Sequence, residues 1–287
     1  MPSERDLRRR VKSVKNIQQL TRAMQLVAAS KMRRAQEAVL ASRPFEHKLR
    51  TVLNDLAPYA DPELSPLLVR RTPVKKVAVI LITTDRGLVG PMNVNLVRST
   101  LRWAQGQPAV SYVAAGRKGI ASLRRLRAPV IAEFPGIPDR PTTADTNVIS
   151  RVAVEEFLKG EVDEVHLAFT RFINTLRQEP MIQRLLPLVP EDEDIDDLPP
   201  LQYIFEPDAE TVMNELLPRF VEVSVYQAIL ESKASQFSAQ MVAMRNATDA
   251  AGDLISELAL AANKARQTRI TKEMLEIASG AEALSKG

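Results

Sequence analysis

Residues 230–265 have the sequence LESKASQFSAQMVAMRNATDAAGDLISELALAANKA. The stretch from 219 to 279 around them holds no proline and one glycine, so it predicts a single long helix. A seven-residue repeat sustained over about five heptads predicts a left-handed coiled coil, so this helix needs a partner helix. Small and apolar residues mark the seam at Leu230, Ala234, Phe237, Met241, Met244, Thr248, Ala251, Ile255, Leu258, Ala262 and Ala265.

Residues 3–57 predict the partner helix, capped by Ser3. We expect its apolar stripe to face the C-terminal helix, and Pro44 to kink or interrupt it. Residues 1–50 carry 13 Lys or Arg and 4 Asp or Glu, so this helix is strongly positive. The stripe comprises Ile17, Leu20, Met24, Val27, Ala28, Met32, Ala35 and Val39.

A different pattern follows a proline-rich linker over residues 57–73. The run KVAVILIT (76–83) is typical of a buried parallel strand. Further strands are predicted at 110–114, 130–134, 165–170 and 182–188, and helices at 93–104, 118–125 and 144–158. Their alternation predicts a Rossmann-like α/β domain with a largely parallel sheet.

The predicted organisation is an N-terminal coiled-coil helix (1–57), an α/β foot domain (58–207) and a C-terminal coiled-coil helix (208–287). The acidic segment 190–200 is interpreted as a solvated loop, and the last helix as starting near Asp208 with a kink at Pro218. Because both helices attach to one domain, they must pair antiparallel. The longer one should overhang as a single helix over residues 264–285, and a partner should enclose that overhang.

The composition excludes several classes of site. The chain has no cysteine, so thiol catalysis, disulfides and cysteine-bound zinc are ruled out. Its two histidines, His47 and His166, lie in dissimilar contexts and predict neither a metal site nor a catalytic triad. No apolar run of about 20 residues is present, and the charged N-terminus lacks the features of a secretory signal.

The segment TTDRGLVGPMN (83–93) has the glycines of a phosphate loop but lacks the GxGxxG spacing and the GK[ST] ending. We interpret it as a structural strand-to-helix turn, with Asp85 in an ion pair or as a turn cap. Nucleic-acid binding by the basic first helix is disfavoured, because its apolar stripe is needed for the partner helix.

Three stretches together resemble the gamma subunit of the rotary F-type ATP synthase: SVKNIQQLTRAMQLVAASKMRRAQ (13–36), TTDRGLVGPMN, and MVAMRNATDAAG with NKARQTRITKEMLEIASGAEAL (241–252, 263–284). FINTLRQEP (172–180) adds to the likeness, which covers essentially the whole chain. The resemblance implies a two-helix shaft inside a ring of three alpha and three beta subunits. It also implies a foot standing on the membrane c ring beside the epsilon subunit.

The same resemblance implies that proton flow turns the c ring and shaft, and that the shaft drives the beta sites through ATP synthesis or hydrolysis. The catalytic residues belong to beta, so we expect no catalytic residue, cofactor or metal here. Peripheral attachment at the cytoplasmic face of a bacterial plasma membrane is expected, without membrane insertion. The implied partner contacts are Met24, Arg266, Gln267 and Thr271 toward beta, and Tyr203 and Glu206 toward the c ring and epsilon.

Two departures from the family pattern stand out. Val89, Gly90 and Pro91 replace the usual Cys-Gly-Gly, and Gln240 stands where a basic residue is common. The competing hypothesis is a free-standing α/β enzyme or nucleotide-binding protein with a coiled-coil oligomerisation tail.

Overall fold

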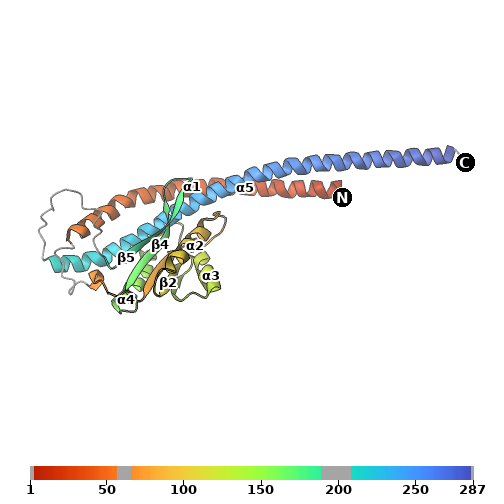
Figure 1. Cartoon of the computed structure of the whole chain (residues 1–287). Coiled ribbons are helices and arrows are strands. Elements are labelled where there is room, and N and C mark those ends of the chain that lie inside the picture. The colour runs from red at the N-terminus through yellow and green to blue at the C-terminus, as the bar shows by residue number, and fades with distance from the viewer. Residues whose placement is uncertain (1–2, 57–65, 189–207, 286–287) are drawn as a thin grey trace. The chain divides into compact units, whose positions relative to one another are not determined.

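The computed structural model describes residues 3–56, 66–188 and 208–285. The chain divides into two compact units, one made of Met1–Val27 with Met241–Gly287 and the other of Ala28–Gln240. Two long helices, α1 (Glu4–Leu56) and α5 (Ala209–Ser285), contribute to both units (Figure 1). We call the first the two-helix unit and the second the α/β unit.

The α/β unit contains a five-stranded sheet in the order β3-β2-β1-β4-β5. Neighbouring strands from β3 to β4 run parallel, and β5 runs antiparallel to β4. The predicted fold class is therefore confirmed. The last strand, predicted at 182–188, starts and ends earlier in the sequence, at Gln178 and Leu186. The strands are β1 (Val77–Ile82), β2 (Val110–Ala115), β3 (Val130–Phe134), β4 (Glu164–Phe172) and β5 (Gln178–Leu186). The helices are η2 (Pro66–Leu68, a 3-10 turn), α2 (Met92–Ala104), α3 (Arg117–Leu126) and α4 (Thr143–Leu158).

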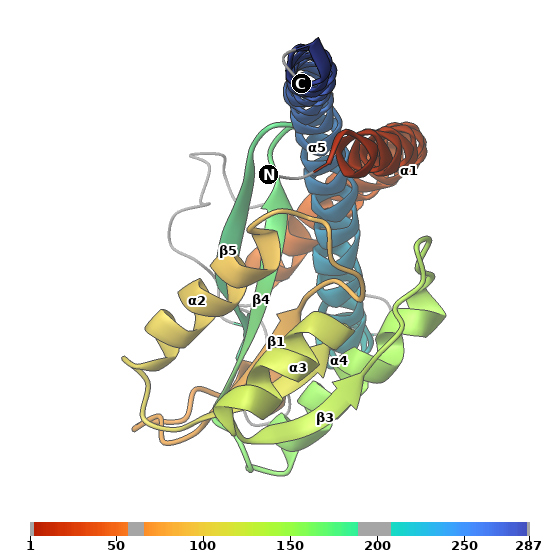
Figure 2. The same cartoon turned by 90° about the vertical axis from the view of Figure 1, so that its right-hand side faces the viewer.

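Each face of this sheet buries its own core, as the alternation of side chains along a strand requires. Val77, Val79 and Leu81 of β1 pack with α2 and α3 on one face. Ala78 and Ile80 belong to the core on the other face, with side chains of α4, the end of α1 and the start of α5. Figure 2 shows α2 and α3 in front of the sheet.

Within the α/β unit, α5 is buried on all sides from Val225 to Ser238. Every residue of that range is buried except the half-buried Tyr226, including seven serine, lysine, glutamate or glutamine residues. A helix surrounded in this way belongs to a core rather than to a surface. The helix starts next to Asp208, as expected, and the carboxylate of Asp208 caps it by accepting the amide of Thr211 at 2.8 Å.

Neither proline interrupts its helix: α1 continues through Pro44, where a kink or an interruption was expected, and α5 continues through Pro218. Both proline rings are exposed, as are Leu40 and Asn214 one turn earlier, whose carbonyls lose their helical donors. Those carbonyls therefore lie on the solvent side, where water can hydrate them.

The two-helix unit is an antiparallel pair. Thr21 contacts Thr248, whereas Glu4, further back on α1, contacts Arg269, further on along α5. From Met241 to Ala265 every seam position predicted on α5 is buried or half-buried, which confirms that pattern. The amide of Asp6 donates to Ser3 Oγ at 3.2 Å, so the predicted cap of α1 is also present.

The stripe predicted on α1 is wrong in this unit. Ile17 is 53% exposed, Leu20 61% and Val27 55%, so these side chains face away from α5. The buried or half-buried seam follows the same four- and three-residue steps one position away, and half of it is polar. Its members are Leu7, Val11, Val14, Gln18, Thr21 and Gln25.

Candidate functional site

The carboxyl ends of the parallel strands are where doubly wound folds bind ligands, at the point where the strand order reverses. Here that point lies between β1 and β4, and α5 occupies the end of β4. Ser235 Oγ donates to the carbonyl of Thr170 at 3.0 Å, and the amide of Phe172 donates to the Glu231 carboxylate at 2.8 Å. The chain's own helix thus fills the place that the enzyme hypothesis needs for a substrate.

The 83–93 segment is a structural turn, as interpreted from the sequence. Asn93 donates to Thr84 Oγ1 at 2.7 Å and its side-chain oxygen accepts the Thr84 amide at 3.2 Å, so the turn closes on itself. Asp85 Oδ1 accepts the amides of Arg117 and Gly136 at 3.0 and 2.9 Å. Asp85 is therefore a cap that joins the loops after β1, β2 and β3.

A charged junction beside this turn escaped the sequence reasoning. Lys233 of α5 is 5% exposed, and its Nζ donates to the carbonyl of Ile137 at 2.8 Å. Burial lowers the pKa of Lys233, whereas the charges of Asp85 and Asp139 oppose that shift. Lys31 of α1 binds Asp139 at 2.6 Å. The detectable signal was a lysine inside a run of small and apolar residues.

Asp139 has its pKa displaced by competing effects. Burial pushes the pKa of this carboxyl up, but the hydrogen bond and charge of Lys31 and the charge of Lys233 together hold it below its usual value. The ionised carboxylate therefore fastens the loop after β3 to α1, and the Ile137 carbonyl of the same loop accepts from Lys233 of α5.

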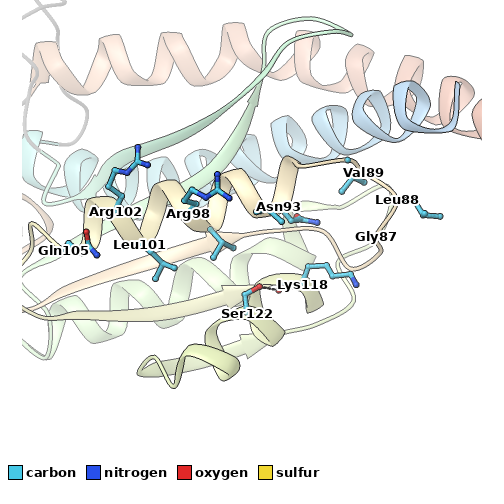
Figure 3. A pocket seen from close by; sticks show the side chains of 13 residues that line it. Gly87, Leu88, Val89, Asn93, Arg98, Leu101, Arg102, Gln105, Lys118 and Ser122 are labelled. Carbon is cyan, nitrogen blue, oxygen red and sulfur yellow. Dashed lines mark hydrogen bonds between the residues drawn. The ribbon is translucent and has the colours of Figure 1, made fainter. Parts of the chain in front are cut away.

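An open groove of about 620 Å³ lies between α2 and α3, under the 87–90 turn (Figure 3). Arg98, Arg102 and Lys118 line it together with apolar side chains such as Val94 and Leu101, and no carboxylate is among its lining residues. Leu88 is 58% exposed at its rim, with a backbone φ of 64°. This surface suits an acidic partner better than a metal or a cation.

The two-helix unit exposes a second surface. The predicted contact residues Arg266, Gln267 and Thr271 are all exposed on α5, and Met24 is half-buried on α1. They do not form one cluster: Met24 lies near the level of Thr248, and Arg266 is 18 residues further along α5, or about 27 Å. Tyr203 and Glu206 lie outside the described residues.

Past Arg269, α5 has no partner helix within the two-helix unit. Every residue from Ile270 to Ala281 is exposed, including Met274 at 65% and Ile277 at 73%. The C-terminal end of α5 extends beyond the start of α1 in Figure 1. The single-helix segment thus begins after Arg269, because Glu4 still contacts Arg269, and the predicted start at Lys264 was too early.

Among the residues that the structure describes, no group of three or more acidic or histidine side chains is placed to hold a metal ion. Each helix in this part of the chain is too short or too polar to span a bilayer.

Comparisons with known proteins match the chain along its length. The family model described as ATP synthase matches residues 3–284. The ATP synthase gamma chain of Dehalococcoides mccartyi (strain CBDB1) is 50% identical over 291 residues, covering 99% of this chain and 100% of the relative.

Solved structures are similar as well. A chain of the central stalk and c-ring structure of the Tetrahymena thermophila mitochondrial ATP synthase has a TM-score of 0.63 and 26% identity, over 79% of this chain and 99% of that one. A rotor chain of the Euglena gracilis mitochondrial ATP synthase shares the fold, with a TM-score of 0.68 and 17% identity over 93% of this chain and 98% of that one.

Proposed function

The chain belongs to the ATP synthase gamma-chain family, and on that premise we propose how its two units serve the rotor. It is a central-stalk subunit of the rotary ATP synthase and is not itself catalytic. In the proposed arrangement the two-helix unit is the shaft inside a ring of alpha and beta subunits. The α/β unit is the foot, which stands on the membrane c ring with the epsilon subunit.

The observation that carries this proposal is the outer surface of the two-helix unit. Its apolar side chains Ile17, Leu20 and Val27 are more than half exposed although α5 lies beside them. Exposed apolar faces of this kind mark surfaces that a partner covers. A ring of subunits around the pair would cover the stripe on α1 and the single-helix segment of α5 together.

The same surface is strongly basic. In the α1 part of this unit, residues 1–27, seven side chains are Lys or Arg and two are acidic. Exposed ion pairs are worth about 0 to 1 kcal/mol each, so a rotating shaft can exchange them with acidic loops of beta without becoming trapped at one angle. A shaft shifts the beta sites only through contacts that differ from one angle to the next.

We place the predicted beta contacts at two levels of this shaft. Met24 is at one level, and Arg266, Gln267 and Thr271 are at another, about 27 Å further along α5. Tyr203 and Glu206 are proposed to face the c ring and epsilon. We also propose attachment at the cytoplasmic face of a bacterial plasma membrane, and coupling of proton flow to ATP synthesis and hydrolysis.

Co-assembly tests this proposal. Purified alpha and beta subunits are mixed with the chain, and the complex is isolated by size before its ATPase activity is measured. We expect one chain per three alpha-beta pairs and an ATPase rate above that of alpha and beta alone. Saturable nucleotide binding by the isolated chain, without assembly, would support the free-standing enzyme instead.

A further inference from the structure

We propose that Arg43 and Glu231 form the joint through which torque passes, within the α/β unit, between the sheet and the two long helices α1 and α5. The Arg43 guanidinium lies over the Glu231 carboxylate, with Nε donating to Oε1 at 2.8 Å and Nη2 donating to Oε2 at 3.1 Å. One helix is α1 and the other is α5, so the pair connects them within the α/β unit. It rests on the proposed function.

The same two side chains also hold the sheet. Arg43 Nη2 donates to the carbonyl of Phe172 at 2.7 Å, and the Phe172 amide donates to Glu231 Oε2 at 2.8 Å. Phe172 is the last residue of β4. Three elements, α1, α5 and the central part of the sheet, therefore meet at one ion pair.

The carboxylate has a full set of donors. Besides Arg43 and Phe172, Gln227 Nε2 donates to Glu231 Oε1 at 3.2 Å, and Ser42 Oγ donates in turn to the side-chain oxygen of Gln227. The Glu231 side chain is 6% exposed, and Val39, Leu230 and Ala234 form a small apolar core around Phe172. A buried charge with every acceptor used is held in one geometry.

Stability alone does not account for such a pair. Apolar residues of similar volume often stabilise a core as well as or better than an ion pair does, because a buried charge loses its hydration; here that applies to Glu231, whereas Arg43 is 38% exposed. A bidentate pair also restricts the relative orientation of its two side chains, since the planar guanidinium fits a carboxylate in few geometries. Twisting α1 or α5 against β4 must break these bonds, so the joint resists torsion.

The test uses the assembled complex of alpha, beta and this chain. The alpha-beta ring is immobilised, a probe particle is attached to the exposed face of α3, and its angular variance is recorded during pauses between steps. The variant Glu231→Gln removes the carboxylate charge, and Arg43→Lys keeps the positive charge but removes the bidentate guanidinium. Glu222→Gln is the matched control, because Glu222 pairs with Arg219 in an exposed salt bridge on the same helix.

We expect both joint variants to assemble, to hydrolyse ATP as the wild type does, and to show wider angular variance, while the control keeps the wild-type variance. Variance unchanged in both joint variants would overturn the proposal. So would loss of assembly in both with the control intact, because the pair would then be a determinant of folding only. Failure of the wild-type chain to assemble would instead overturn the proposed function.

An independent readout is hydrogen exchange of the Phe172 amide in the free chain. The Phe172 amide donates to a charged acceptor, and a neutral amide oxygen accepts more weakly, so Glu231→Gln should accelerate exchange of this amide by roughly 10-fold or more. Exchange at the wild-type rate would contradict the bond on which the joint depends.

Discussion

Arg269 Nη2 lies 3.2 Å from the Glu4 carboxylate, and this contact marks the level at which α1 begins. Beyond it α5 continues alone to Ser285. A single helix with its apolar side chains in water gains little from packing, and most helical stability in proteins comes from packing.

The first prediction concerns this single-helix segment. In the free chain, amides from Ile270 to Ala281 should exchange roughly 100-fold faster than those from Met241 to Ala262, because local opening there exposes no buried core. Hydrogen exchange with mass spectrometry measures both ranges in one sample. Equal, strong protection of the two ranges would contradict the account, and slower exchange after assembly with alpha and beta would support it.

The second prediction concerns the hydroxyl pair in the seam of the two-helix unit. Thr21 Oγ1 and Thr248 Oγ1 are 2.8 Å apart. Replacing one threonine by valine removes the hydrogen-bond partner of the other, so Thr21→Val should lower the free energy of unfolding by about 1 kcal/mol. The double variant Thr21→Val with Thr248→Val should lose less stability than the two single variants added together.

Urea unfolding of the two single variants and the double variant measures this coupling. Ser256→Ala on the exposed face of α5 serves as the control, and it should change stability by less than about 0.5 kcal/mol. Additive effects at Thr21 and Thr248 would mean that the hydroxyl pair contributes nothing.

The third prediction concerns the close approach of β1 and β2 at their carboxyl ends. A Cβ on Gly116 would lie 2.2 Å from the carbonyl oxygen of Thr83, and its φ is 97°. Gly116→Ala should therefore destabilise the α/β unit by more than about 3 kcal/mol. Gly136 has a φ of 84° but open space around it, so Gly136→Ala isolates the backbone cost, about 1 to 2 kcal/mol. Equal costs for the two would refute the steric argument.

The fourth prediction concerns pH. Burial lowers the pKa of His166, although Glu164 at 2.8 Å acts in the opposite direction and Arg184 adds to the lowering. The unfolded chain then binds more protons than the folded chain just below the ordinary value of about 6.5, so stability falls as pH drops through that range.

Urea midpoints between pH 7.5 and 6 test this for the wild type and for His166→Gln, which cannot titrate. The variant should show the smaller fall in stability over this pH range. A slope that is equal in the wild type and in His166→Gln would contradict the assignment.

The sequence predicted the helices and strands well because their patterns are local. The continuous apolar, β-branched run of β1 indicates a buried strand, and the heptads of α5 indicate a coiled-coil helix. The face of α1 was mistaken because Gln18, Thr21 and Gln25 are polar, whereas Ile17 and Leu20 form the more apolar stripe. In an isolated protein the apolar stripe would be the buried one; here it is available to a partner.

The joint between Arg43 and Glu231 could not be predicted in the same way. Arg43 and Glu231 are 188 residues apart in sequence, and each has an ordinary interpretation as a surface charge. Only the fold shows that Glu231 is buried against the end of β4. The contact residues carried over from the family likeness depend on partners, so the geometry of one chain leaves them as proposals.

The most direct test of the central claim is rotation. The alpha-beta ring is fixed to a surface, a bead is attached to the α/β unit, and ATP is added, with the intact chain or with a chain ending at Arg269. If this chain is the rotor shaft, we expect stepwise rotation in one direction with the intact chain, and weaker torque when the single-helix segment is removed. A complex that hydrolyses ATP while the bead on the intact chain does not turn would contradict it.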